Sequence, residues 1–200
     1  LEAINAAGNP LHPVHGERDA AVLRGALRIA EDMGVGTVVT MSGLPGYPGD
    51  RVPAWITTVW PPENLELLQY QWERALEWWG PVAEEARTRG VRIAVEMHAN
   101  QLVYNVPGLL RLREAVGDVV GANFDPSHLI WMGADPLAAI DALAGAIHHV
   151  HAKDTRIEAS AAVRSRLETV DNPHTAERAW NYVAVGTGHP DGIDFWTRFI

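Results

Sequence analysis

In this chain, acidic and imidazole side chains occur at the ends of short apolar runs. The stretch GANFDPSHLIW, residues 121 to 131, ends such a run at Asp125 and offers His128 three positions later. Pro126 and Ser127 between them indicate a turn outside any helical pattern. The pair is therefore either a turn with a capping Asp or half of a metal site.

Two further stretches have the same character. VEMH, residues 95 to 98, places Glu96 at the end of an apolar run, and HVHAKD, residues 149 to 154, places His151 after another. Glu, Asp and His supply the oxygen and nitrogen ligands that hold divalent cations in proteins. The chain has no cysteine, so thiolate metal sites and disulfides are excluded.

If these runs are strands, residues two apart share one face of the sheet. Each strand then carries a polar row: Glu96 with His98, Asn123 with Asp125, and His149 with His151 and Lys153. Burying such rows without partners is costly, and a central cation would satisfy them. Carboxylate and imidazole ligands favour Mn, Co, Zn or Fe over Ca or Cu(I), and two carboxylates with one imidazole leave a position open for substrate oxygens.

The elements that must position these residues alternate between strand and helix. Periodicity and turn residues predict strands at 1–7, 35–41, 91–98, 119–125 and 147–154, and helices at 18–34, 63–89, 106–117 and 135–146. Asp135 is the expected N-cap of the last of these helices, and Gly80 with Pro81 is expected to bend the second. We expect 155–185 to be irregular or weakly helical, and 186–200 to be a loop leading into a final helix.

Near-continuous apolar strands joined by helices predict a parallel sheet, either an open doubly wound sheet or a closed (β/α)8 barrel. No early turn carries the G-x-G-x-x-G pattern of a dinucleotide-binding open sheet. Glu96, Asp125 and His151 instead fall at the C-terminal ends of three strands, where barrels place their functional side chains. The sequence therefore favours the barrel.

Composition limits the class of protein. The 200 residues, 47% hydrophobic, are enough for one core, so we expect a single domain over 1–200. A formal net charge of −9 disfavours nucleic acid as a partner. No apolar run is long enough to cross a bilayer and no signal pattern is present, which predicts a soluble cytoplasmic protein.

The chain begins without Met in an apparent strand and ends within an apparent helix. We expect it to be truncated at both ends. Such a fragment alone would expose strand edges and is expected to be inactive.

VEMH, NFDPSHL and HVHAKD, in this order and together with the NPLHP loop, resemble the sugar phosphate isomerase/epimerase group of xylose isomerase-like TIM barrels. That group also includes inosose dehydratase and endonuclease IV-like enzymes. The resemblance implies one divalent metal ion, most often Mn, with Co, Zn, Mg or Fe as alternatives. It also implies Glu96, Asp125 and His151 as metal ligands, and His128 as a substrate-binding residue. In that group the fourth ligand is a Glu on strand eight, so the resemblance places it beyond residue 200 and makes the five strands here strands three to seven of eight.

The resemblance implies an isomerase or epimerase acting on a keto-sugar or related carbohydrate through a metal-stabilised enediolate. Glu96 would move the proton, Lys153 would neutralise the developing oxyanion and His98 would relay a proton. A lyase or dehydratase acting on a 3-keto glycoside or inosose uses the same intermediate and stays open, as does a non-catalytic sugar-binding barrel. A nuclease is disfavoured because of the charge, and a homo-oligomer stays open.

Other polar residues carry weaker expectations. His12 and Asn5 are candidate substrate contacts, and Arg156 with Lys153 is a candidate phosphate contact. Asp154 is expected to be an ion-pair partner rather than a base. His149 is expected to be a satisfied core histidine.

Overall fold

The computed structural model describes residues 1–200, apart from the side chain of Asn172. The chain divides into two compact units. Leu1–Phe124 and Leu143–Val150 form one, here called the sheet unit, and Asp125–Ala142 and His151–Ile200 form the other, here called the hairpin unit. Each unit is described by itself.

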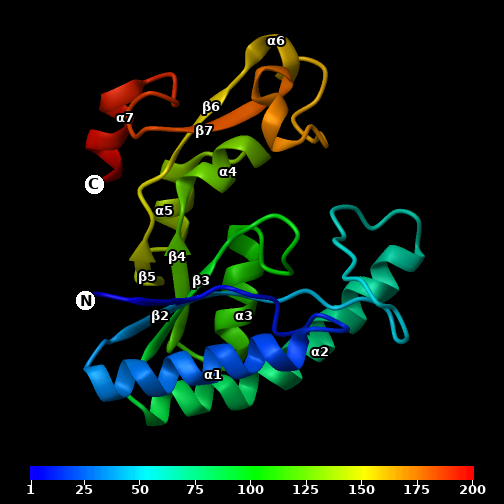
Figure 1. Ribbon diagram of the computed structural model, residues 1–200, viewed down its shortest axis with the longest axis vertical. Helices are drawn as coiled ribbons and strands as arrows, with labels where there is room; N and C mark the ends of the chain where they lie inside the picture. The colour runs from blue at the N-terminus through cyan, green and yellow to red at the C-terminus, as the bar shows by residue number, and fades with distance from the viewer. The chain divides into compact units, whose positions relative to one another are not determined.

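A five-stranded parallel sheet, in the order β1-β2-β3-β4-β5, forms the centre of the sheet unit (Figure 1). Its strands are β1 Ile4–Ala6, β2 Thr37–Met41, β3 Arg92–Glu96, β4 Val120–Phe124 and β5 Ile147–Val150. The spatial order equals the chain order, as expected when each strand returns through a helix. Each of the five predicted strand ranges contains a strand of this sheet, and the predicted parallel sheet is confirmed.

Three helices belong to the sheet unit: α1 Gly16–Met33, α2 Glu63–Thr88 and α3 Val106–Val116. α1 packs on β1 and β2, while α2 packs on β3 and α3. α2 continues through Pro81, where the sequence led us to expect a bend. Pro81 and Glu77, the residue four positions before it, are both exposed, so water can satisfy the carbonyl that a proline leaves without its helical partner.

One glycine lets two strands approach closely. A side chain at Gly121 on β4 would place its Cβ 2.4 Å from the carbonyl oxygen of Ala146 and 2.7 Å from the ring of His148. The register between β4 and β5 also shifts between Ala122 and Asn123. β5 therefore pairs with β4 only because residue 121 has no side chain.

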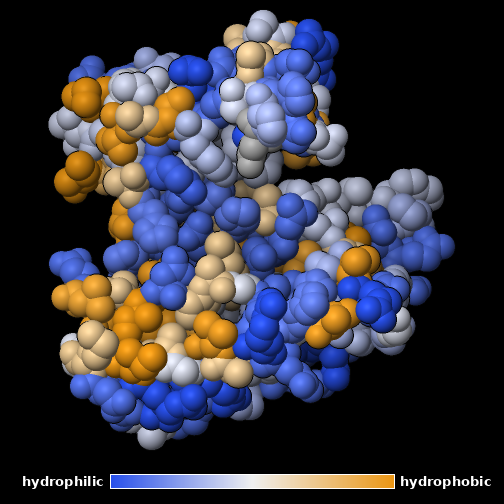
Figure 2. Space-filling view, in the orientation of Figure 1, coloured by the Kyte–Doolittle hydropathy of each residue, from blue (hydrophilic) through white to orange (hydrophobic). Residues whose placement is uncertain are grey.

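The surface of the sheet unit is not uniformly polar. Val22, Ile29 and Met33 leave a stripe of apolar side chains exposed along α1. Hydrophobic areas also interrupt hydrophilic ones on the face drawn in Figure 2. No helix among the described residues has the length and the apolar character needed to cross a bilayer.

The hairpin unit combines short helices with a two-stranded antiparallel sheet. Its elements are α4 Pro126–Met132, α5 Pro136–Ala142, β6 Asp154–Ile157, α6 Ala159–Ala162, the 3-10 helix η1 Asn172–Glu177, β7 Trp180–Val183 and α7 Gly192–Phe199. Asp135 caps α5 as predicted, because its Oδ1 accepts a hydrogen bond from the backbone N–H of Leu137 at 2.9 Å.

Two expectations about this unit were wrong. Residues 155–185 are not irregular throughout, because β6 and β7 pair within them. The predicted strand 147–154 is split, since β5 ends at Val150 and Asp154 opens β6. Each new strand has four residues, too few for a clear alternating pattern.

Candidate functional site

Glu96 and Asn123 form a buried polar pair in the sheet unit. They are register partners on β3 and β4, and they are 6% and 0% exposed. The side-chain amide of Asn123 donates a hydrogen bond from Nδ2 to Glu96 Oε2 at 2.8 Å. This bond satisfies part of the hydrogen-bonding capacity of a carboxylate that water barely reaches. The pair belongs to the polar rows that the strand pattern predicted.

The two histidines predicted near this pair are less buried. His98 follows β3, is half-buried, and its Nδ1 lies 2.6 Å from the carbonyl oxygen of Ala99. A carbonyl accepts only, so the proton of a neutral His98 is on Nδ1 and its Nε2 carries the lone pair. His149 is the register partner of Asn123 on β5. It is half-buried, so the expectation of a core histidine was wrong.

Asp125 is the N-cap of α4 in the hairpin unit. Its Oδ1 accepts hydrogen bonds from the backbone N–H of Ser127 at 2.9 Å and from the Ser127 hydroxyl at 2.5 Å. The capping interpretation of Asp125 is therefore confirmed, but the turn expected here is a seven-residue helix that contains His128. Pro126 at the first helical position after an Asp N-cap is a strong helix start, which a search for longer periodic segments overlooks.

The second oxygen of Asp125 faces a cation. Asp125 Oδ2 is buried and lies 2.9 Å from Lys153 Nζ, without the geometry of a hydrogen bond. His128 is 1% exposed, with its Nε2 3.5 Å from Asp125 Oδ2 and 3.1 Å from Lys153 Nζ. Its Nδ1 lies 3.0 Å from the hydroxyl oxygen of Tyr182. Asp125, His128, Lys153 and Tyr182 are called the Asp125 cluster below.

Tyr182 is the member of this cluster that the sequence did not suggest. It lies on β7, 54 residues from His128. The alternation of Trp180 and Tyr182 in WNYV was the available signal, since it places both rings on one face of a strand.

Asp154 does not act as the ion-pair partner that we expected. Its buried carboxylate accepts hydrogen bonds from the backbone N–H groups of Thr155, Gly186, Gly188 and His189 at 2.8 to 3.1 Å, and from the indole N–H of Trp196 at 3.0 Å. Among the described residues, no Lys or Arg forms an ion pair with it. Asp154 therefore ties the loop after β7 and α7 to the start of β6.

The remaining predicted residues have other surroundings. His151 is half-buried in the segment after β5. His12 Nδ1 accepts hydrogen bonds from the backbone N–H groups of Val14 and His15 at 3.0 and 3.2 Å. Asn5 is exposed in the middle of β1.

Arg156 is exposed and forms an ion pair with Glu158 at 2.7 Å. The hydrogen bond to Glu158 raises the pKa of the Arg156 guanidinium. The hydrogen bond from Arg156 is also the largest cause that lowers the pKa of the Glu158 carboxyl, and the hydrogen bond from the Asn181 amide is the next. Arg156, which we expected to bind a phosphate together with Lys153, is thus already paired with the carboxylate of Glu158.

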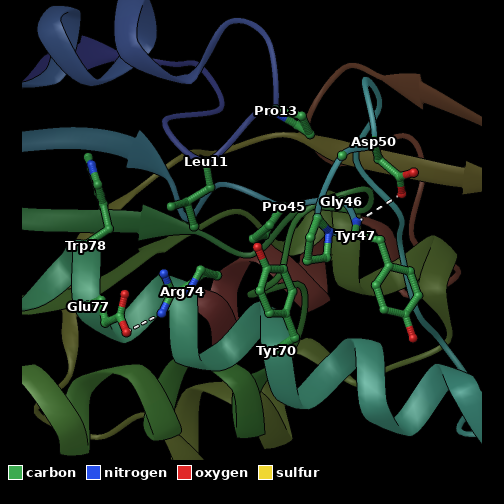
Figure 3. A pocket seen from close by; sticks show the side chains of 12 residues that line it. Leu11, Pro13, Pro45, Gly46, Tyr47, Asp50, Tyr70, Arg74, Glu77 and Trp78 are labelled. Carbon is green, nitrogen blue, oxygen red and sulfur yellow. Dashed lines mark hydrogen bonds and ion pairs between the residues drawn. The ribbon is translucent and has the colours of Figure 1, made fainter.

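A pocket of about 620 Å³ in the sheet unit is lined by none of the predicted site residues. Figure 3 shows Tyr70, Arg74, Glu77 and Trp78 extending from α2 along one side of it. The opposite side is a loop in which Asp50 Oδ2 accepts a hydrogen bond from the backbone N–H of Tyr47 at 3.0 Å. Two charged groups of this pocket are paired with one another, since Arg74 and Glu77 form an ion pair.

The donor atoms of the predicted ligands fit a divalent cation. Glu96 and Asp125 offer carboxylate oxygens and His151 offers an imidazole nitrogen, the mixture that Mn²⁺, Zn²⁺ and related ions accept. Asp125 Oδ2 is the donor atom that a bound cation would stabilise most, because it is buried without a hydrogen bond. In this structure the ammonium of Lys153 supplies the positive charge beside it.

Comparison with known proteins identifies the family. The model of the xylose isomerase-like TIM barrel family matches residues 3–199, and the chain belongs to this family. The five parallel strands and their helices are part of that (β/α)8 architecture, so the predicted fold is confirmed.

Two relatives illustrate the sequence similarity. The chain is 49% identical over 206 residues to uncharacterized protein YfiH of Bacillus subtilis (strain 168), covering 100% of this chain and 65% of that protein. It is 27% identical over 107 residues to inosose dehydratase of Yersinia enterocolitica, covering 52% of this chain and 36% of that protein. The chain thus spans at most 65% of the length of these relatives.

Solved structures share the fold. A xylose isomerase-like TIM barrel protein from Mycobacterium smegmatis in complex with magnesium superposes with a TM-score of 0.64 at 16% identity, covering 99% of this chain and 60% of that one. An L-ribulose 3-epimerase superposes with a TM-score of 0.55 at 22% identity, covering 74% and 49%. At these identities the likeness concerns the fold alone.

Proposed function

We propose that the protein is a divalent-metal-dependent sugar isomerase or epimerase, acting in the cytoplasm on a keto-sugar or related carbohydrate. The observation that carries the proposal is the Asp125 cluster, in which a buried carboxylate, a buried imidazole and an ammonium lie within 3.5 Å of one another. Groups of this kind are costly to bury for structure alone. Membership of the xylose isomerase-like family and the structural likeness to an epimerase support it.

We assign the metal to Glu96, Asp125 and His151, with Mn²⁺ as the preferred ion. A bound cation would polarise a substrate carbonyl and acidify the neighbouring C–H. The structure of the Mycobacterium protein contains magnesium. It therefore supports a divalent cation here, but not the choice of Mn²⁺.

Each chain residue then has a defined task. Glu96, held by Asn123, moves the proton of the carbon next to the carbonyl. Lys153 places positive charge near the developing oxyanion, and His98 relays a proton or holds a hydroxyl. His128 binds a substrate hydroxyl, with His12, Asn5 and Arg156 as outer contacts.

Elimination is the second candidate function. A dehydratase or lyase acting on an inosose or 3-keto glycoside would start from the same proton abstraction and then expel the group on the β-carbon. The match to inosose dehydratase favours it. A non-catalytic sugar-binding barrel is the third candidate.

Solvent proton exchange tests the proposal. We would incubate the full-length protein, loaded with Mn²⁺, with a panel of ketopentoses, ketohexoses and inososes in D₂O, and follow the C–H signals beside the carbonyl by NMR. Loss of one such signal, with an epimer as product, is expected. Formation of an unsaturated product instead would establish elimination. No exchange with any member of the panel would contradict both enzymatic functions.

Glu96→Gln is the matching variant, and we expect it to slow exchange by a factor of roughly 10² to 10⁴, the usual contribution of a positioned general base. Glu85→Gln is its control, because Glu85 is also partly buried in the sheet unit but is paired with Arg24 and Arg89. Equal loss in the two variants would show that the effect of Glu96→Gln is on stability.

A further inference from the structure

The pocket of about 620 Å³ in the sheet unit is formed by two loops and one helix. Leu11 and Pro13 belong to the loop after β1, residues 45–50 belong to the loop after β2, and the helix is α2. TIM barrels build their ligand sites from the loops at the carboxyl ends of the strands. The pocket therefore lies at a position where this fold binds small molecules, and its volume is in the range of such sites.

The loop wall of the pocket is held in a fixed shape. Gln71 is fully buried, and its side-chain amide donates hydrogen bonds to the carbonyl oxygens of Pro45 and Ala54, both at 2.7 Å. Within the same loop, Asp50 accepts a hydrogen bond from the backbone N–H of Tyr47 at 3.0 Å. Because the loop is already ordered, a ligand binds to it without the loss of loop entropy that weakens binding to a mobile wall.

The helix wall carries two aromatic rings. Tyr70, Arg74 and Trp78 follow one another at intervals of four residues, which places them on one face of α2. Figure 3 shows the ring of Tyr70 directed from α2 toward the loop that carries Pro45. The ring of Trp78 packs edge-on against that of Trp79, with ring centres 5.0 Å apart. These rings offer apolar surface against which the C–H groups of a sugar ring can pack.

Each of the two rings also carries a polar group that a ligand can use. Among the described residues, neither the Tyr70 hydroxyl nor the Trp78 indole N–H has a hydrogen-bond partner. A phenol hydroxyl donates and accepts, whereas an indole N–H only donates. A sugar hydroxyl can bind either group, because it too donates and accepts. The helix wall thus matches both the apolar faces and the hydroxyl rim of a sugar ring.

The charges in the lining disfavour a charged ligand. Asp50, Arg74 and Glu77 are the charged lining residues, one positive and two negative. Arg74 forms an ion pair with Glu77, and its guanidinium carbon lies 5.8 Å from the centre of the Tyr70 ring. An anion would therefore meet an excess of negative charge, and a cation would meet Arg74 at the aromatic ring that it needs. An uncharged ligand meets neither obstacle.

We propose that this pocket is a binding site for the ring of an uncharged sugar or cyclitol, separate from the residues assigned to the metal and to catalysis. Tyr70 and Trp78 pack against the ring, and their hydroxyl and indole N–H bind its hydroxyl groups. The described lining residues include none to which the proposed function gives a role. Binding here therefore depends neither on the metal nor on turnover.

NMR of the ¹⁵N-labelled indole groups of the full-length protein, recorded in excess EDTA, tests the site without metal. The probe is methyl β-glucopyranoside, an uncharged sugar ring without a carbonyl. The Trp78 signal is assigned by its loss in Trp78→Phe. We expect this signal to shift on titration and to saturate with a dissociation constant of about 1 mM, the affinity expected for a ligand of this size.

Trp60 gives the internal control, because it is 75% exposed and does not line the pocket. Its indole signal should stay in place during the titration. The proposal is overturned if the Trp78 signal does not move at glycoside concentrations about tenfold above the expected dissociation constant, or if the two signals move equally.

Two variants separate packing from hydrogen bonding, with binding measured by saturation-transfer NMR on the glycoside. Trp78→Ala removes the larger ring and should weaken binding at least about tenfold. Tyr70→Phe keeps its ring, loses only the hydroxyl, and should weaken binding about three- to tenfold. Tyr104→Phe, outside the pocket, should change it by less than about twofold. Unchanged binding in Tyr70→Phe, or equal weakening in Tyr104→Phe, would overturn the proposal.

Charged ligands test the chemical class. Inorganic phosphate and choline should each bind more weakly than the glycoside, because of the lining charges. Tighter binding of either one, or a proline-rich peptide that shifts the Trp78 signal when the glycoside does not, would overturn the assignment to sugars. Absence of solvent exchange in the wild type would instead remove the proposed function and leave this site standing.

Discussion

Asn123 holds Glu96 by a 2.8 Å hydrogen bond between neighbouring parallel strands, and neither side chain is more than 6% exposed. Asn123→Ala removes the donor and leaves a buried carboxylate oxygen without this partner. We expect a loss of about 1–3 kcal/mol in the free energy of unfolding, measured by urea denaturation. Because Glu96 also loses its fixed orientation, the exchange rate should fall at least about tenfold.

The control for this change is Asn181→Ala. Asn181 also donates from its side-chain amide to a carboxylate, that of Glu158 at 3.0 Å, but on the partly exposed β7. Water can replace this bond, so we expect a change within about 0.5 kcal/mol. If the two variants lose equal stability, burial of the Glu96 pair has no energetic role.

Asp154 should be a major determinant of stability in the hairpin unit. Asp154→Asn replaces one accepting oxygen by a donor that faces backbone N–H groups and the Trp196 indole. We expect a loss of about 3 kcal/mol, together with faster proteolysis of the loop after β7. Gly188→Ala should act in the same direction, because its Cβ would lie 2.6 Å from Asp154 Oδ1.

An exposed aspartate gives the comparison for Asp154. Asp191 pairs with Arg198 at 2.9 Å, and both side chains are more than half exposed. Asp191→Asn should therefore cost no more than about 1 kcal/mol. A loss in Asp154→Asn as small as this would contradict the role assigned to its carboxylate.

His148 should make stability depend on pH. Burial, the largest cause, lowers the pKa of its imidazole below the ordinary value near 6.5. As the pH falls below 6.5, the unfolded chain binds a proton at His148 and the folded chain does not. The free energy of unfolding should therefore decrease as the pH falls below 6.5, whereas His148 should not affect it above that pH. Urea denaturation at several pH values measures this dependence.

His148→Gln should flatten that dependence, whereas His15→Gln, at an exposed histidine without a capping hydrogen bond, should preserve it. An NMR titration of the wild-type rings gives an independent check. If His148 gains its proton at or above pH 6.5, burial does not control its titration.

The strands of the sheet unit were predictable because each is a compact apolar run flanked by turns. The run containing Glu96 and the run before Asp125 are buried on both faces, which is the pattern of a parallel sheet covered by helices. Their polar ends marked the candidate site for the same reason, since a polar group after a continuous apolar run is conspicuous.

The hairpin unit was less predictable. β6 and β7 have four residues each and are separated by 22 residues without the two-residue turn that indicates a hairpin. The Tyr182 contact to His128 spans 54 residues, so no local pattern could reveal it. The prediction for Asp154 was wrong because the backbone N–H groups that bind its carboxylate lie far along the chain, so its sequence context is that of any charged residue before a loop.

The metal content of the full-length protein, purified without chelator, tests the central claim most directly. Plasma emission on the wild type should give about one divalent ion per chain, since the proposed residues form a single site. Glu96→Ala/His151→Ala should lose that ion, while Glu85→Gln should retain it. A wild type that binds no divalent ion even after reconstitution with Mn²⁺, or a double variant that binds as much as the wild type, would contradict a metal-dependent function for these residues.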